Sequence, residues 1–233
     1  MKVLISALLI FASIFCTAQG SFWFGPKFGP AIGTQMWNNI DQQPLFKYHA
    51  AFFVESFAEE EDSGSLFAQL GYHKRGSAIR QRGFNFDVFS TGFEFNNASL
   101  QLGAKRFLPL ESKNRAYYSF AARLEYTINT NLDDFANSQF ASFYPFETFV
   151  NKWNYGLSIG AGYSIEISEK IGVFFEATIH PDLSYQYQQP ALNNVVVPSP
   201  FGGSATLSER QIRNLSLEIS FGLNFLRKVE YID

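Results

Sequence analysis

The chain contains three histidines, and their placement is the first feature that could support chemistry. His49, His73 and His180 each lie on the polar side of a segment in which polar and apolar residues alternate. If the second and third of these segments pair in a hairpin centred near residue 61, His49 faces His73 directly. Two or three neutral imidazoles held together could bind a transition metal. The alternative, which we expect, is that they belong to a hydrogen-bonded filling inside the protein, with no metal and no cofactor.

Charged side chains of both signs occupy the same polar faces. In a closed barrel they would be buried, and a buried charge is tolerated only when it has partners. Eight strands leave no aqueous channel once their side chains are in place, so we expect a plug of paired charges; a narrow or gated pore for small solutes is the alternative. The predicted lumen network comprises Lys47, His49, Glu55, His73, Arg75, Lys105, Arg123, Glu125, Glu176, His180, Asp182 and Glu218.

Catalysis on such a barrel would need a serine and a histidine at hydrogen-bond distance, with an acid behind the histidine. His180 and Ser184 share a face, but they lie four residues apart, which is about 13 Å along a strand. No histidine is followed two residues later by a serine. We therefore predict no catalytic residues and no enzymatic activity.

The elements that must carry these side chains are eight segments of alternating polarity, as expected for strands that face two environments. In the sixth segment, the odd positions from Trp153 to Ile167 are apolar, and the even positions from Lys152 to Glu166 are polar or glycine. Connections alternate between short and long, which is typical of outer-membrane barrels with an even number of strands. The predicted strands span residues 21–33, 45–58, 64–79, 92–109, 115–129, 151–167, 171–187 and 210–226.

The composition of the two faces indicates which of them looks inward. The polar face is rich in Gly, Ala and Ser, and small residues suit the crowded interior of an eight-stranded barrel. Aromatic residues, 18% of the chain, gather near segment ends as in the girdles of membrane barrels. We predict an all-β, eight-stranded antiparallel transmembrane up-and-down β-barrel. The alternative is a soluble secreted barrel or sandwich with a buried aromatic core.

The amino terminus differs from the rest of the chain. Lys2 precedes an apolar run that ends at Phe15, and small residues at Cys16 and Ala18 fit a signal-peptidase site. The run is shorter than the roughly 20 residues that a spanning helix needs. Acylation of Cys16 in a lipoprotein signal is the alternative, although bulky Phe15 precedes that cysteine.

We predict a signal peptide at residues 1–18, a barrel domain at 19–233 and location in the outer membrane. The formal net charge of -3 provides no basic face, so nucleic acid is not an expected partner. The expected partners are outer-membrane lipid around the barrel and a protein at the extracellular loops. The expected role is therefore structural or interactive, through those loops.

One long connection, residues 130–150, is rich in aromatic side chains. Exposed aromatic side chains often mark a partner site. The alternatives are that loop and strand tips pack on each other, or that the end of this connection extends the sixth strand. The candidates for partner binding are Phe140, Phe143, Tyr144 and Phe146.

Several stretches resemble the PorT-like outer-membrane barrels of Bacteroidetes-type bacteria. They are FWFGPKFGPAIG at the start of the barrel domain, LGYHKRGSA at 70–78, ASLQLGAKRFLPL at 98–110 and RNLSLEISFGLNF at 213–225. The TAQ at 17–19 is similar to signal-peptide ends in that group. The resemblance covers essentially the whole mature chain and implies an eight-stranded outer-membrane barrel without catalytic residues. For some members it also implies an accessory role in protein secretion.

Two prolines lie inside the first predicted strand. Pro26 and Pro30 have the same parity, so their missing N–H donors would face the same neighbouring strand. We expect either one weak seam in the barrel or a strand that starts later than residue 21.

Overall fold

The computed structural model describes residues 20–38, 42–57, 64–82, 88–108, 114–136, 144–196 and 203–229. The predicted signal peptide at 1–18 lies outside the described residues. No helix in the described ranges is long and apolar enough to cross a membrane.

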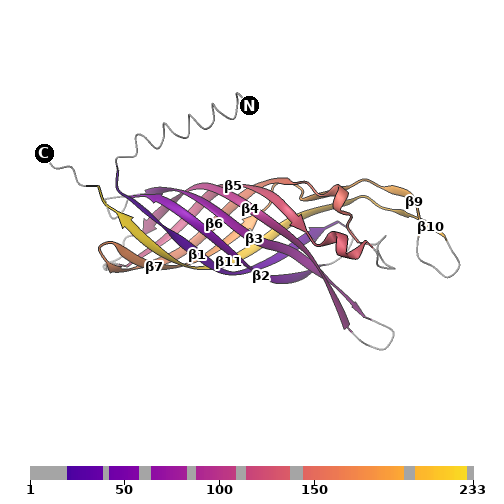
Figure 1. Ribbon diagram of the computed structural model, residues 1–233, viewed down its shortest axis with the longest axis horizontal. Helices are drawn as coiled ribbons and strands as arrows, with labels where there is room; N and C mark the ends of the chain where they lie inside the picture. The colour runs from indigo at the N-terminus through magenta and orange to yellow at the C-terminus, as the bar shows by residue number, and fades with distance from the viewer. Residues whose placement is uncertain are drawn as a thin grey trace, which may run out of the picture.

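Eight long antiparallel strands form a closed barrel (Figure 1). Strands β1 to β7 each pair with the next in sequence, β7 pairs with β11, and β11 returns to pair with β1. The predicted all-β, eight-stranded antiparallel barrel is thus confirmed. The bounds are β1 Phe22–Trp37, β2 Gln43–Ser56, β3 Gly64–Arg82, β4 Val88–Leu108, β5 Arg115–Thr130, β6 Trp153–Ser168, β7 Ile171–Pro181 and β11 Arg210–Arg227.

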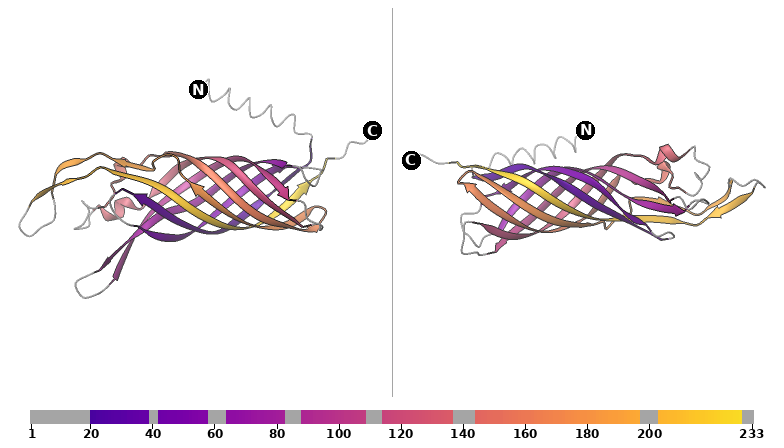
Figure 2. Two further views of the ribbon diagram at one scale, coloured as in Figure 1. Left: turned by 180° about the vertical axis from the view of Figure 1, so that it is seen from behind. Right: turned by 90° about the horizontal axis from the view of Figure 1, so that it is seen from below.

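The two ends of the barrel differ. The beginning of β1 lies beside the end of β11, where Phe22 pairs with Arg227, and we call this the termini end. The opposite, or loop, end carries a separate two-stranded ribbon that projects beyond the barrel (Figures 1 and 2). The short elements at the loop end are η1 Leu132–Phe135, η3 Glu147–Phe149, β8 Tyr187–Gln189, β9 Leu192–Val196 and β10 Ser204–Leu207.

The loop end departs from the sequence prediction in two ways. The first two long connections are instead mostly strand, so that only residues 38–42 and 83–87 separate the paired strands there. The seventh strand was expected to run through 171–187, but it stops at Pro181, and the chain resumes pairing with β11 only at Tyr187. Local alternation cannot reveal either feature, because both depend on whether a neighbouring strand continues alongside.

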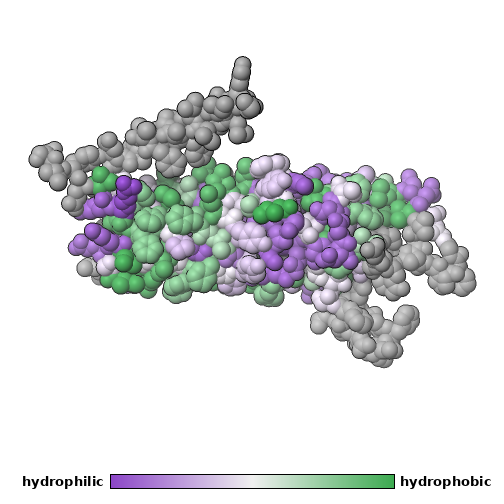
Figure 3. Space-filling model, viewed as in Figure 1, coloured by the Kyte–Doolittle hydropathy of each residue, from purple (hydrophilic) through white to green (hydrophobic). Residues whose placement is uncertain are grey.

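Apolar side chains cover the outside of the barrel. Phe46, Leu66 and Leu70 are 71%, 70% and 66% exposed, and the exposed set includes Phe28, Leu102, Phe120, Leu124, Ile159, Phe175 and Ile179 from the other strands. In Figure 3 the hydrophobic surface lies towards the termini end and hydrophilic residues gather towards the loop end. Water would disfavour so large an apolar surface, whereas lipid stabilises it.

The seam between β1 and β11 contains the two prolines. Pairing with β11 skips Gly25–Pro26 and Gly29–Pro30, whereas pairing with β2 continues through both. Carbonyl oxygens of β11 come close to these glycines, and a Cβ added to Gly29 would lie 1.9 Å from the Ile219 oxygen. The strand begins at Phe22, so the missing donors fall inside it and on one seam. Only glycine permits the close approach there, and the weakness of this seam stays a prediction.

Adding a methyl group at this seam should weaken barrel closure. We expect Gly29→Ala to push β1 away from β11 and to lower the urea midpoint of unfolding in detergent micelles. Gly203→Ala is the control, because nothing lies within 4 Å of the added atom there. Equal midpoints for the two variants would contradict the steric argument.

A charge on the outer face should be costly in lipid. We expect Leu70→Arg to reduce the free energy of unfolding in lipid vesicles by about 2–4 kcal/mol, the cost of an arginine near the bilayer midplane. Leu70→Ala is the control, since it removes apolar contact without adding charge. If Leu70→Arg were as stable as Leu70→Ala, the outer face would not be in hydrocarbon.

Candidate functional site

The barrel interior brings the predicted network residues together. Eleven of the twelve are buried among the described residues: His49, Glu55, His73, Arg75, Lys105, Arg123, Glu125, Glu176, His180, Asp182 and Glu218. Lys47 is the exception, because its side chain is 27% exposed and pairs with Glu94 at 2.6 Å. The alternation that places apolar residues in lipid places these side chains on the inner face.

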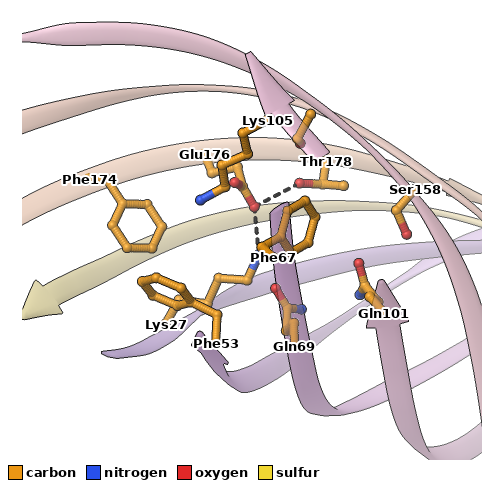
Figure 4. Close-up of a pocket in the computed structure, with 11 residues that line it drawn as sticks. Lys27, Phe53, Phe67, Gln69, Gln101, Lys105, Ser158, Phe174, Glu176 and Thr178 are labelled. Atoms are coloured by element: carbon orange, nitrogen blue, oxygen red, sulfur yellow. Dashed lines mark hydrogen bonds and ion pairs between the residues drawn. The ribbon is translucent and has the colours of Figure 1, made fainter. Parts of the chain in front are cut away.

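Two lysine–glutamate pairs form the termini-end cluster. Lys27 Nζ lies 2.5 Å from Glu176, and Lys105 Nζ lies 2.5 Å from Glu55. Tyr117 donates a hydrogen bond of 3.0 Å to the second oxygen of Glu176. Figure 4 shows Lys27 and Glu176 meeting across the lumen from β1 and β7. Two bases therefore neutralise two acids in this cluster.

Aromatic rings surround the ammonium group of Lys105. Its Nζ lies 4.8 Å from the ring centroid of Tyr117, 5.1 Å from Phe53 and 5.6 Å from Phe174. Phe53 and Phe174 also contact each other edge to face across the lumen. Cation–π contacts stabilise a charge that has lost its water, and the rings fill the barrel towards the termini end.

The central cluster begins with two arginines and two carboxylates. Arg75 lies 2.6 Å from Glu125 and 2.9 Å from Asp182. Arg123 lies 2.9 Å from Glu125 and also donates to Asp182. All four side chains are at most 1% exposed. Paired in this way, the charges cross-link β3, β5 and the segment after β7.

The three histidines converge on Glu218, which completes the central cluster. His73 Nδ1 and His180 Nε2 each lie 3.0 Å from a different oxygen of this carboxylate. His49 Nε2 is farther from it, at 3.9 Å, and lies 2.9 Å from Ser220 Oγ. Within the described ranges, no group of three or more His, Cys, Asp or Glu residues is arranged to hold a metal ion.

A serine–histidine–acid chain is present, and the sequence prediction missed it. Ser158 Oγ lies 2.8 Å from His180 Nδ1, and His180 Nε2 lies 3.0 Å from Glu218 Oε2. The three residues come from β6, β7 and β11, so a search for neighbours along one strand could not find them. Ser158 is 3% exposed and lines a cavity of only about 10 Å³ (Figure 4), which leaves no room for a substrate.

The loop end of the lumen is closed by an apolar cluster. Phe93 and Phe95 on the inner face of β4 are fully buried, and Leu132 and Tyr144 from the connection between β5 and β6 pack on them with Ile79. Ring centroids of Phe93 and Tyr144 lie 5.5 Å apart. The described parts of this connection, 131–136 and 144–152, therefore pack on the inner face of β4 at the loop end.

The aromatic partner-binding candidates take different positions. Tyr144 is only 5% exposed, because its ring packs against Phe93 in the apolar cluster at the loop end. A role as a freely exposed ring for partner binding is therefore not supported. Phe146 is half-buried, and its N–H donates to Tyr187 Oη at 3.0 Å. Phe140 and Phe143 lie outside the described residues.

Several other interior residues extend the network. Lys27, Tyr117, Ser158 and Asn214 have the same inward parity as the predicted residues, and that parity could have found them in the sequence. Asn214 links Asp182, at 2.8 Å, to Gln35, at 3.0 Å, and so carries the network towards the loop end. A second cavity, beside Lys105 and Glu166, measures about 40 Å³. A third, of about 170 Å³, lies in the connection between β5 and β6, beside Leu132 and Tyr144.

Comparison with known proteins supports the fold class. No family model and no curated protein matches the chain. Neisserial surface protein A has a similar structure, with a TM-score of 0.50 at 9% identity, over 88% of this chain and 98% of that one. The outer membrane protein OprG from Pseudomonas aeruginosa has a TM-score of 0.47 at 10% identity, over 88% of this chain and 96% of that one. The outer membrane protease OmpT from Escherichia coli has a TM-score of 0.42 at 9% identity, over 90% of this chain and 98% of that one.

The closed ring, the apolar outer surface and this likeness define an eight-stranded antiparallel β-barrel of the outer-membrane type. Identities this low show the fold alone. The PorT-like resemblance has no matching family model and stays a prediction.

Removing one partner of a buried pair should be more harmful than removing both. We expect Lys27→Met to cost about 3–5 kcal/mol of unfolding free energy, because Glu176 is left buried without its main base. The double variant Lys27→Met/Glu176→Leu should recover most of that loss. Urea unfolding in vesicles, followed by tryptophan fluorescence, measures both, and a double variant less stable than the single one would refute the pairing.

Proposed function

We propose that this outer-membrane barrel has a structural or interaction role and binds a protein partner at its loop end, while lipid surrounds its wall. The ribbon formed by β9 and β10 carries this proposal. It pairs internally through Ser204–Val196 and Leu207–Leu192, and it projects beyond the ring of strands (Figures 1 and 2). A projecting ribbon offers backbone groups at its edges, which can pair with an extended segment of another protein.

Two features of the interior support a role that does not involve transport or catalysis. The lumen holds paired charges and aromatic rings, with cavities of about 10 and 40 Å³ in the described barrel. The serine beside His180 is buried. We therefore propose no catalysis and no open pore. Export through a signal peptide at residues 1–18, and the accessory role in secretion that the PorT-like resemblance implies, are further predictions.

Site-specific cross-linking in intact cells tests the proposed partner site. We expect a photoreactive amino acid at exposed Thr206 on β10 to form a cross-link to one discrete protein, because this side chain lies on the projecting ribbon. The matched control is the same amino acid at Phe120 on the wall, which should label lipid only.

The proposal fails if Thr206 and Phe120 give the same cross-linking pattern. It also fails if the purified barrel produces discrete conductance steps in a planar bilayer, because a continuous aqueous path would then run through the filled lumen.

A further inference from the structure

The central cluster has a deficit of one positive charge. The termini-end cluster is balanced, with two lysines against two glutamates. In the central cluster Arg75 and Arg123 face three carboxylates, Glu125, Asp182 and Glu218. A buried carboxylate without compensation is very unfavourable, so another cation is needed nearby.

The remaining buried base, Arg210, lies away from this deficit. Its guanidinium carbon is 5.1 Å from the ring centroid of Trp37 at the loop end. Arg210 precedes Asn214, the neighbour of Asp182, by four residues, which is about 13 Å along a strand. The ion pairs described for the three carboxylates are with Arg75, Arg123 and the histidines. The other described bases that contact these carboxylates are histidines.

His73 has a carboxylate at each ring nitrogen. Nδ1 is hydrogen-bonded to Glu218 Oε1 at 3.0 Å, and Nε2 lies 3.1 Å from Glu125 Oε1, an ion-pair contact that is off the line of a straight hydrogen bond. A neutral imidazole has one N–H group and one lone pair. In the neutral form the lone pair would therefore face a carboxylate oxygen, whereas in the imidazolium both nitrogens are donors.

The other two histidines need no additional proton. His180 Nε2 faces Glu218, while its Nδ1 faces the hydroxyl of Ser158, which can donate. In the neutral tautomer with hydrogen on Nε2, the lone pair of Nδ1 faces a hydroxyl group and the N–H group is on the side of Glu218, although that contact is off the line of a straight hydrogen bond. His49 has one close partner, the Ser220 hydroxyl, and its distance to Glu218 is 3.9 Å. Only His73 is clamped between two acids.

We propose that the barrel interior contains a proton-binding site, in which His73 holds a proton as an imidazolium between Glu125 and Glu218. This proton is the third positive charge of the central cluster and balances its third carboxylate. It joins β3 to β5 and β11, and so makes the packing of the barrel depend on a bound proton.

Nitrogen-15 NMR of histidine-labelled protein in micelles tests the site directly at neutral pH. For His73 we expect both ring nitrogens to have the chemical shift of a protonated nitrogen. For His180 we expect one nitrogen with the shift of a protonated nitrogen and one with that of an unprotonated nitrogen. Loss of a signal pair in His73→Gln and in His180→Gln assigns the resonances. An unprotonated nitrogen on His73 would overturn the proposal, because the proton would then reside on a carboxyl group.

A double-mutant cycle tests the charge balance independently. Every ion pair described for Glu218 is with a histidine, so Glu218→Gln leaves the arginine contacts in place. We expect His73→Gln to lower the folded-to-unfolded ratio about 10- to 100-fold, and His73→Gln/Glu218→Gln to restore most of it, because two bases then face two acids.

His180→Gln is the matched control, and its effect should be clearly smaller because the lost ring is neutral. Equal losses in His73→Gln and His180→Gln, or a double variant no better than His73→Gln, would overturn the proposal.

The proposal also fixes the sign of a pH effect. If the folded state holds one proton more than the unfolded chain, the free energy of unfolding must fall as the pH rises and that proton is released. Glu125 of β5 and Glu218 of β11 contact His73, and His49 of β2 is its partner in the ladder. The other charged or titratable groups of the central cluster are Arg75 of β3, Arg123 of β5, and His180 and Asp182 on and after β7. We expect this loss with rising pH to be larger in the native protein than in His73→Gln/Glu218→Gln; an equal loss in the two proteins would overturn the assignment.

Discussion

Hydrocarbon offers no hydrogen-bond partner, so every backbone N–H and C=O group of a sheet in lipid must be paired within the protein. The chain satisfies this requirement by pairing its first strand with its last one. That closing seam also contains Pro26 and Pro30, which cannot donate. Gly25 and Gly29 let the carbonyl groups of β11 approach the backbone closely at these points. Closure therefore depends on the Gly-Pro pairs as well as on the regular ladder.

Closing the sheet with eight strands fixes how much the interior can hold. The inner face is polar because the outer face must be apolar, so charges are buried as a consequence of the membrane environment. They are then neutralised in layers: lysine–glutamate pairs towards the termini end, and arginines and histidines with carboxylates in the centre. The apolar cluster around Phe93 lies beyond these layers, at the loop end. Little space is left for a solute, so the lipid-facing wall and the loop end remain as the surfaces on which a partner can act.

Much of the fold could be predicted from alternation, because the face of each strand residue follows from its parity alone. The position of β6 and the inward direction of residues such as His73 and Glu125 followed directly from this pattern. The loop end was harder to predict. The end of β1, up to Trp37, is strand because it pairs with β11, and the start of β2 is strand because Gln43 and Pro44 pair with β3. Strand β7 stops at Pro181 because the ladder with β11 is interrupted there.

The candidate site shows where inference from sequence ends. Tyr144 was expected to bind a partner. Its ring instead packs on Phe93, about 50 residues away in the chain, in the apolar cluster at the loop end. Ser158 is hydrogen-bonded to His180, which in turn contacts Glu218, although the three residues belong to three strands. The sequence by itself determined which side chains face lipid and which face the lumen, since a period of two is a local property. Only the tertiary structure decided which of them touch, because contacts across the lumen depend on strand register and ring closure, and no single segment encodes these.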